Sequence, residues 1–265
     1  QFCLVTNPTG RVLAEKMIQC LATDTDPNIL IRATRVSMAL PPPFTVSPAL
    51  LSNTLARTTE HVQVLAAENR LTEVRDILFR LRDVIDEKTF RATLGRDQYE
   101  TLVRETTRIL WPLSTQDVVY ESASWVLEKF NTPALNEKFY LRATDETKWG
   151  RSSTYDQRVL FINRPPYLRN RVIADCEAIL QKWTASFAER NGTTNPPALR
   201  EGADAFFQSN DFLLKLAASY GEFDLVDRAA RHENKWYHEL AERARNAFPK
   251  SRDKESPNNG TEPIR

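Results

Sequence analysis

Glycine is scarce in this sequence: only seven of the 265 residues are glycine. Tight β-hairpins, β-bulges and phosphate-binding loops depend on glycine, because other residues adopt the required backbone conformations only with strain. The sequence also lacks the GxxxxGK[ST] and GxGxxG patterns of nucleotide-binding loops. The scarcity therefore argues against a glycine-rich β protein and against nucleotide chemistry that uses such a loop.

Histidine and cysteine are equally scarce, with three of each. Cys3, Cys20 and Cys176 are widely spaced and form no CxxC pair, so they indicate neither a disulfide framework nor a zinc site. The histidines form neither an HExxH motif nor the ExxH pairs of a di-iron protein. We therefore expect no metal site and no cofactor. The cysteine usage favours an intracellular location, cytoplasmic or nuclear.

The sequence also lacks an excess of charge of either sign, since it has 36 basic and 35 acidic residues. The overall charge thus favours no polyanionic partner. Most of the basic residues are arginine, whose planar head pairs with carboxylates and phosphates. The longest apolar runs are far shorter than the ~18–20 residues that span a bilayer, so we expect no membrane span.

Helical periodicity is what the sequence has in abundance. Asp26-Pro27 and Ser47-Pro48 each place a capping residue before a proline suited to the first helical position. Residues 48–90 predict an antiparallel helical hairpin bent near Asn69-Arg70. Its second half has the clearest helical spacing of the chain, at Leu71, Val74, Leu78, Leu81 and Ile85, widened by Ile77 and Val84. This apolar face is expected to be core, the alternative being a docking surface for a partner helix.

These patterns predict an all-α fold, a bundle of about eight to ten helices. One segment is ambiguous, because its apolar runs fit two short strands or two helix ends around a loop. A small β-hairpin near residues 138–164 is the preferred interpretation.

Composition divides the predicted fold into three parts. Residues 1–190 are expected to form a helical bundle, and the NGTTNPP segment then resembles a linker. Residues 196–248 are expected to form a C-terminal helical subdomain packed on the bundle. Its predicted helices cover about 198–208, 211–219 and 223–248, separated by Ser209-Asn210-Asp211 and Gly221. The polar, proline-bearing residues 249–265 are predicted to be a disordered tail.

One stretch between residues 138 and 171 combines basic residues with aromatic ones. Such a mixture is typical of surfaces that bind single-stranded nucleic acid, where cations contact phosphates and rings stack on bases. The alternative is that the rings fill the core and the cations face water. The candidate nucleic-acid-binding residues are Lys138, Arg142, Lys148, Trp149, Arg151, Arg158, Arg164, Arg169 and Arg171.

A second candidate lies in the sequence RAARHENKWYHELAER, residues 228–243. There Arg231 is followed by six residues and then by His238, a spacing similar to the Arg-x4–6-His motif of HEPN-domain ribonucleases. In that family a polar residue often follows the arginine, and here that residue is His232. The resemblance implies an all-α, metal-independent ribonuclease, commonly a homodimer, with the motif on a late helix. His238 would then be the acid–base group and Arg231 would hold the scissile phosphate. The alternative is a core-edge His232 and a surface His238.

The absence of a complete catalytic pattern decides between these hypotheses. We expect a non-enzymatic helical scaffold or adaptor that mediates protein–protein interaction. Nucleic-acid binding through residues 138–171 is the alternative, and a HEPN-like ribonuclease with Arg231 and His238 is the third hypothesis.

Overall fold

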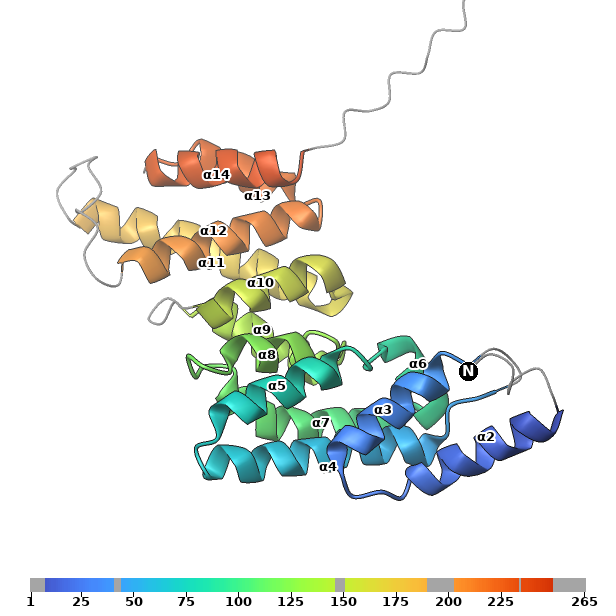
Figure 1. Cartoon of the computed structure of the whole chain (residues 1–265). Helices are drawn as coiled ribbons and strands as arrows, with labels where there is room; N and C mark the ends of the chain where they lie inside the picture. Colours follow the sequence, from blue (N-terminus) through green and yellow to red (C-terminus); the bar gives the residue numbers. More distant parts are fainter. Residues whose placement is uncertain (1–7, 41–43, 146–150, 190–202, 234, 250–265) are drawn as a thin grey trace, which may run out of the picture. The chain divides into compact units, whose positions relative to one another are not determined.

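The computed structural model describes residues 8–40, 44–145, 151–189, 203–233 and 235–249 (Figure 1). The secondary structure in these ranges is entirely helical, as the sequence predicts, and no strand occurs in them. Within the same ranges every helix is either too short or too polar to cross a lipid bilayer. The expected tail at residues 249–265 lies outside the described residues from 250 onward.

Backbone contacts divide the chain into two compact units. Unit 1 consists of residues 1–139 and 151–159, and unit 2 consists of residues 140–150 and 160–265. The division passes through two helices, α9 and α10. The linker predicted from the sequence, NGTTNPP at residues 191–197, lies outside the described residues. Each unit is considered by itself below.

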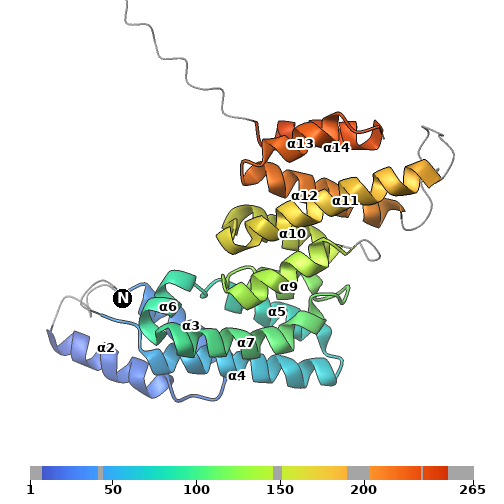
Figure 2. The same ribbon diagram turned by 180° about the vertical axis from the view of Figure 1, so that it is seen from behind.

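Unit 1 is organised around four helices that each pack against two of the others. Helix α4 packs against α5 and α7, and α8 also packs against α5 and α7. Figures 1 and 2 show α3, α4 and α7 side by side from opposite directions. The helices of this unit are α2 (Pro8–Leu21), α3 (Pro27–Met38), α4 (Pro48–Ala67), α5 (Leu71–Arg82), α6 (Glu87–Leu94), α7 (Arg96–Leu113) and α8 (Tyr120–Leu127), with the first parts of α9 (Pro133–Ala143) and α10 (Arg151–Asn163).

The hairpin predicted over residues 48–90 is present as α4 and α5, which pack on each other. Asn69 forms the bend with a φ of 59°, a left-handed conformation that asparagine tolerates better than most residues. The predicted apolar face is core: Val74, Ile77, Leu78 and Leu81 are buried in α5. The Asp26-Pro27 start is confirmed as well, since the Asp26 carboxylate accepts a hydrogen bond from the Asn28 backbone N–H.

Unit 2 contains the last parts of α9 and α10 and the C-terminal helices. Helix α11 packs against α12, and α12 and α13 both pack against α14. The helices are η1 (Pro166–Leu168), α11 (Arg169–Glu189), α12 (Ala203–Ser219), α13 (Phe223–Ala230) and α14 (Lys235–Ala247). Buried residues of α12, among them Phe212, Leu214 and Leu216, form its core.

The β-hairpin expected near residues 138–164 is wrong for the described residues. Its two apolar runs lie in α9 and α10 instead. The short runs looked strand-like because they are buried on one side: Phe139, Tyr140 and Ala143 in α9, and Val159 and Leu160 in α10, are buried. Their spacings of one, three and four residues also fit a helix face, so periodicity over a short run cannot distinguish the two structures.

The predicted number of helices is also too low, because the described residues form thirteen α-helices. The predicted helix 223–248 is two helices, α13 and α14, separated after Ala230. The break changes the helix phase, so that Tyr237 is buried and Trp236 only partly so, whereas a continuous helix would turn Trp236 inward.

An error of the opposite kind occurs at residues 209–211, where a break was expected. Helix α12 continues through Ser209, Asn210 and Asp211, and all three side chains are buried. Asp211 also accepts a hydrogen bond from the Lys215 ammonium group one turn later, at 2.6 Å. Polar residues that resemble a loop are thus part of a helix interface.

Candidate functional site

The candidate nucleic-acid-binding residues are divided between the two units. Lys138 and Arg158 belong to unit 1, whereas Arg142, Arg164, Arg169 and Arg171 belong to unit 2. Lys148 and Trp149 lie outside the described residues, and the side chain of Arg151 is not described either.

The aromatic residues of this segment are mostly turned into the protein. Phe139 and Tyr140 are buried, and Tyr155 and Phe161 are partly buried. Only Tyr167, which is 50% exposed, offers a largely open ring among the described aromatic residues of the segment. Stacking on bases needs accessible rings, so most of these rings contribute to packing instead.

Several cations of the segment already have intramolecular contacts in unit 2. The Arg169 Nε donates a hydrogen bond to the Glu222 carboxylate at 2.6 Å. The Arg171 guanidinium lies 5.0 Å from the ring centre of Tyr140 and 3.7 Å from the Asp175 carboxylate. The Arg164 guanidinium lies 5.4 Å from the ring centre of Phe248. These contacts compete with phosphate for the same donors.

The residues of the HEPN-like motif lie in two different elements. Arg231 follows the last residue of α13, and its Nε donates a hydrogen bond to the Asp227 carbonyl at 3.2 Å. His238 lies in α14, with Nε2 2.6 Å from the His232 carbonyl, which requires Nε2 to carry the proton. The motif of the family lies on one helix, and this chain departs from that arrangement.

His232 occupies the core-edge position that the helix pattern predicts. The side chain is partly buried, and Nε2 lies 3.3 Å from the Leu180 carbonyl. Its ring lies 4.8 Å from the ring of Tyr237, measured between centres. His238 is exposed, as the alternative interpretation expects.

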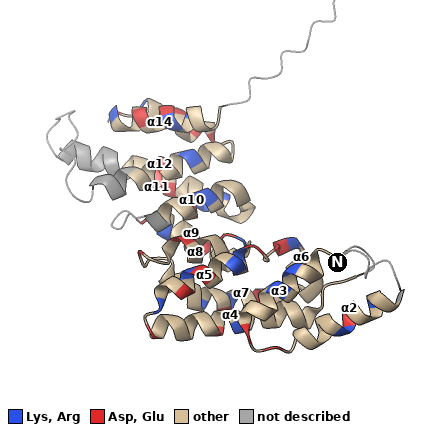
Figure 3. Ribbon diagram, viewed as in Figure 1, with Lys and Arg blue, Asp and Glu red and all other residues tan. Residues whose placement is uncertain are grey.

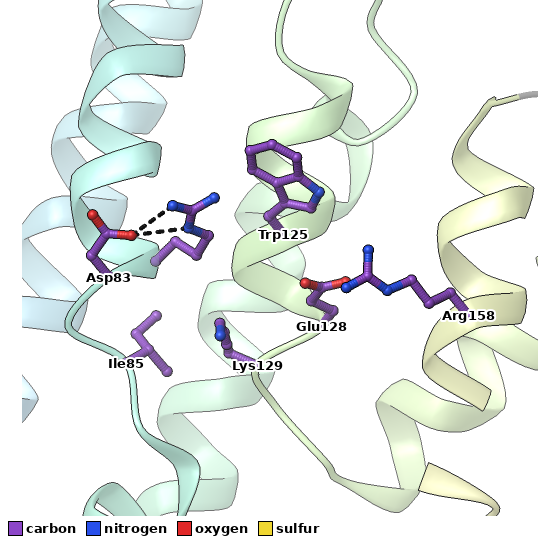
Figure 4. Close-up of a pocket in the computed structure, with 7 residues that line it drawn as sticks. Asp83, Ile85, Trp125, Glu128, Lys129 and Arg158 are labelled. Carbon is purple, nitrogen blue, oxygen red and sulfur yellow. Dashed lines mark hydrogen bonds and ion pairs between the residues drawn. The ribbon is translucent and has the colours of Figure 1, made fainter. Parts of the chain in front are cut away.

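A cavity of about 510 Å³ in unit 1 gathers a different set of charged residues (Figure 4). It lies where α5 and α8 end, beside α10. Its lining residues are Arg82, Asp83, Ile85, Trp125, Glu128, Lys129 and Arg158. Of these, only Arg158 was among the candidates from the sequence.

The local structure explains why cations collect here. Arg82 is the last residue of α5, and Lys129 lies two residues after the end of α8. The C-terminal end of a helix carries about half a negative charge, which stabilises nearby cations. The last carbonyls of α8 are already hydrogen-bonded to the backbone N–H groups of Glu128, Lys129 and Phe130.

Arg82 makes contacts on two sides at the wall of the cavity. Its Nε and Nη2 both donate to Asp83 Oδ1, at 3.1 and 2.7 Å. Its guanidinium lies 4.8 Å from the ring centre of Trp125. The other side-chain oxygen of Asp83 is 3.4 Å from Arg35. Asp83 therefore lies between two arginines.

Glu128 is the unusual group of the cavity. Its Oε2 atom is buried without a hydrogen-bond partner, although Arg82, Lys129 and Arg158 line the same cavity. Burial raises the pKa of Glu128 above its ordinary value, and the positive charges of Arg158, Lys129 and Arg82 oppose this shift. Figure 4 shows Glu128 and Arg158 pointing toward each other across the cavity.

No single sequence pattern could have found this site, because its residues come from three separate parts of the chain. Arg82-Asp83 and Glu128-Lys129 are ordinary charged pairs at helix ends. Within the described residues, no group of histidine, cysteine and acidic side chains could hold a metal ion. In comparisons with known proteins, no protein-family model, no curated protein and no solved structure matches the chain.

Proposed function

We propose that this chain is a non-enzymatic helical scaffold or adaptor, built as a bundle of helices, that binds another protein. The observation that carries the proposal is a set of exposed apolar side chains on α2. Val12, Leu13 and Met17 are 52%, 53% and 56% exposed. Contiguous exposed apolar side chains often mark protein-binding surfaces.

The packing of α2 explains why these side chains form a surface. Ile18 and Leu21 pack against the core cluster of Ala22, Leu30, Ala33 and Leu50, which anchors the helix. Leu13 and Met17 are one turn apart and so lie on the same side of α2. The core therefore covers only part of the apolar side of α2, and Val12, Leu13 and Met17 remain exposed.

An amphipathic helix of the partner is the occupant that suits this surface. A helix presents apolar side chains at spacings of three and four residues, which match the spacing of Leu13 and Met17. The flexible thioether of Met17 adapts to differently shaped apolar partners. Arg11, Glu15 and Lys16 on the same helix provide both charge signs at its rim.

The test begins with affinity purification of binding proteins from an extract of the source organism, followed by reconstitution of the complex from purified components. Isothermal titration calorimetry then measures the Kd of the wild type and of Leu13→Glu/Met17→Glu. We expect the double variant to weaken binding by at least about tenfold, because a buried Leu or Met contributes about 1.5–3 kcal/mol.

Val64→Glu is the matched control, because Val64 is 54% exposed but lies on α4. It introduces the same kind of charge at an exposed apolar position. Binding that both variants weaken equally, or that neither weakens, would contradict the assignment to α2. Glutamate favours helices, so circular dichroism should show both variants folded.

A further inference from the structure

We propose that the cavity of unit 1 binds the carboxylate or phosphate group of a small organic anion. This site is separate from the α2 surface, and its residues carry the proposal independently of any protein partner. Three features of the cavity support the proposal: its balance of charges, the unpaired oxygen of Glu128 and its size.

The charges of the cavity leave a positive excess. The Asp83 carboxylate is engaged by both Arg82 and Arg35, so it cannot neutralise the remaining cations. Lys129 and Arg158 then oppose the single carboxyl group of Glu128. Both cations are exposed. One bound anion would bring this part of the cavity close to neutrality.

Glu128 gives the site a dependence on pH. When its carboxyl group is protonated, it can donate a hydrogen bond to an anion instead of repelling it. The charged groups that face it are Arg82 and Asp83 from the end of α5, Lys129 beside it and Arg158 from α10. The raised pKa of Glu128 shifts this protonation toward neutral pH.

The cavity is larger than an inorganic ion requires. Its volume of about 510 Å³ is in the range of pockets for small organic ligands. Ile85 and the indole of Trp125 form the less polar part of the wall, beside the cations. An anion with a small apolar or aromatic body would therefore fit better than phosphate alone.

The indole N–H of Trp125 provides a local probe for the full chain. Its signal in a ¹H–¹⁵N spectrum can be assigned among the five tryptophans by its loss in Trp125→Phe. The ligands to titrate are benzoate, phenyl phosphate and inorganic phosphate, with neutral benzamide and cationic benzylamine as controls. We expect benzoate and phenyl phosphate to shift the signal, inorganic phosphate to bind more weakly, and the controls to have no effect. The stronger of the two organic anions identifies the preferred head group.

Charge variants separate specific binding from general attraction. Lys129→Gln/Arg158→Gln should weaken benzoate binding at least about tenfold, because charge-assisted hydrogen bonds are lost. Arg96→Gln/Arg104→Gln removes two exposed cations of the same unit that do not line the cavity, and should leave the Kd unchanged within about twofold. Thermal unfolding should first show that both double variants are folded.

Glu128→Gln tests whether the negative charge of Glu128 opposes anion binding. For the wild type, benzoate binding should strengthen as pH falls from 8 to 5.5, a range in which benzoate itself stays ionised. Glu128→Gln should bind benzoate more tightly at pH 8 and lose this pH dependence. The proposal is overturned if no anion shifts the Trp125 signal, if benzylamine or benzamide shifts it equally, or if Arg96→Gln/Arg104→Gln weakens binding as much as the cavity variant.

Discussion

The cations of the unit 1 cavity and the arginines of unit 2 show how differently similar residues can be used. In unit 2, Arg169, Arg228 and Arg245 are each paired with an acidic residue from a distant part of the sequence. In the cavity, Lys129 and Arg158 share the wall with Glu128, whose carboxyl group has a buried, unpartnered oxygen. Figure 3 shows basic and acidic residues interspersed along the helices. Whether a cation can bind a ligand thus depends on whether an acidic side chain already pairs with it, and not on how many charged residues lie near it in the sequence.

The buried Tyr140 of unit 2 makes the contrast clear. The hydroxyl of the buried Tyr140 donates a hydrogen bond to Asp175 Oδ2 at 2.6 Å, and Arg171 lies over the Tyr140 ring. Burial, followed by the hydrogen bond to Asp175, raises the pKa of Tyr140 above its ordinary value. The hydroxyl therefore stays protonated and serves stability, whereas the carboxyl group of Glu128 is left without a comparable partner.

The largest predicted change in stability is therefore that of Asp175→Ala, which leaves the buried Tyr140 hydroxyl without its acceptor. We expect the free energy of unfolding to fall by about 2 kcal/mol, the cost of a buried unsatisfied donor. Urea unfolding followed by circular dichroism measures this change. Asp175→Asn keeps an acceptor oxygen and should cost clearly less. Equal losses for the two variants would show that the hydrogen bond is not the cause.

Glu128→Gln in unit 1 is predicted to increase the free energy of unfolding, whereas Asp175→Ala lowers it. Because the pKa of Glu128 is raised in the folded state, the folded chain holds this proton at higher pH than the unfolded chain, and the stability contributed by the group falls as pH rises above 4.5. Glu128→Gln should increase the free energy of unfolding at pH 8 by no more than about 1 kcal/mol, since solvent screens this partly exposed group.

The matching measurement is urea unfolding of both proteins at pH 5 and pH 8. The wild type should lose stability relative to Glu128→Gln between these values. A variant that is less stable than the wild type at pH 8 would mean that the Glu128 carboxylate is well paired in solution.

A smaller effect is expected from Arg228→Ala in unit 2, which removes the ion pair with Glu177. The two side chains are 47% and 46% exposed, so solvent screens their attraction. The free energy of unfolding should change by less than about 0.5 kcal/mol. A double-mutant cycle with Glu177→Ala isolates the pair, and a coupling energy above 1 kcal/mol would contradict this interpretation.

No effect at all is expected from His238→Ala on RNA. Arg231 and His238 lie in different elements and each contacts a backbone carbonyl, which departs from the arrangement of HEPN-like ribonucleases. A labelled RNA incubated in EDTA should stay intact with the wild type and with the variant. Cleavage that disappears in His238→Ala would instead support the ribonuclease hypothesis.

Nucleic-acid binding through residues 138–171 can be tested on the same material. Fluorescence anisotropy with short single-stranded RNA and DNA, at low and physiological salt, should show no tight binding, because Arg169 and Arg171 already have acidic neighbours. Salt-sensitive binding that Arg164→Ala/Arg169→Ala abolishes would favour that alternative.

Local sequence signals were sufficient where they repeat over several turns or use a specific cap. The spacing of Val74, Leu78 and Leu81 places them on one face at any helical phase, and all three are buried. The Asp26 cap is equally local, because its hydrogen bond spans only two residues. Such features need no knowledge of the rest of the chain.

Local signals failed where a neighbouring helix changes the environment. Ser209, Asn210 and Asp211 resemble a loop, but packing within unit 2 buries them in α12. The break after Ala230 was not inferred either, because neither glycine nor proline occurs in the sequence between α13 and α14. Tyr237 is buried there and its hydroxyl donates to the Ile179 carbonyl, a contact between residues far apart in the sequence.

The sequence by itself determined that this protein is helical, because scarce glycine disfavours tight β-turns and repeated apolar spacings of three and four residues favour helices. It also determined most of the apolar residues that face the core. Only the tertiary structure decided which charged residues are paired and which line a cavity, because Arg82, Glu128 and Arg158 meet only when α5, α8 and α10 are assembled. Burial and charge pairing depend on distances between distant segments, which local sequence patterns do not specify.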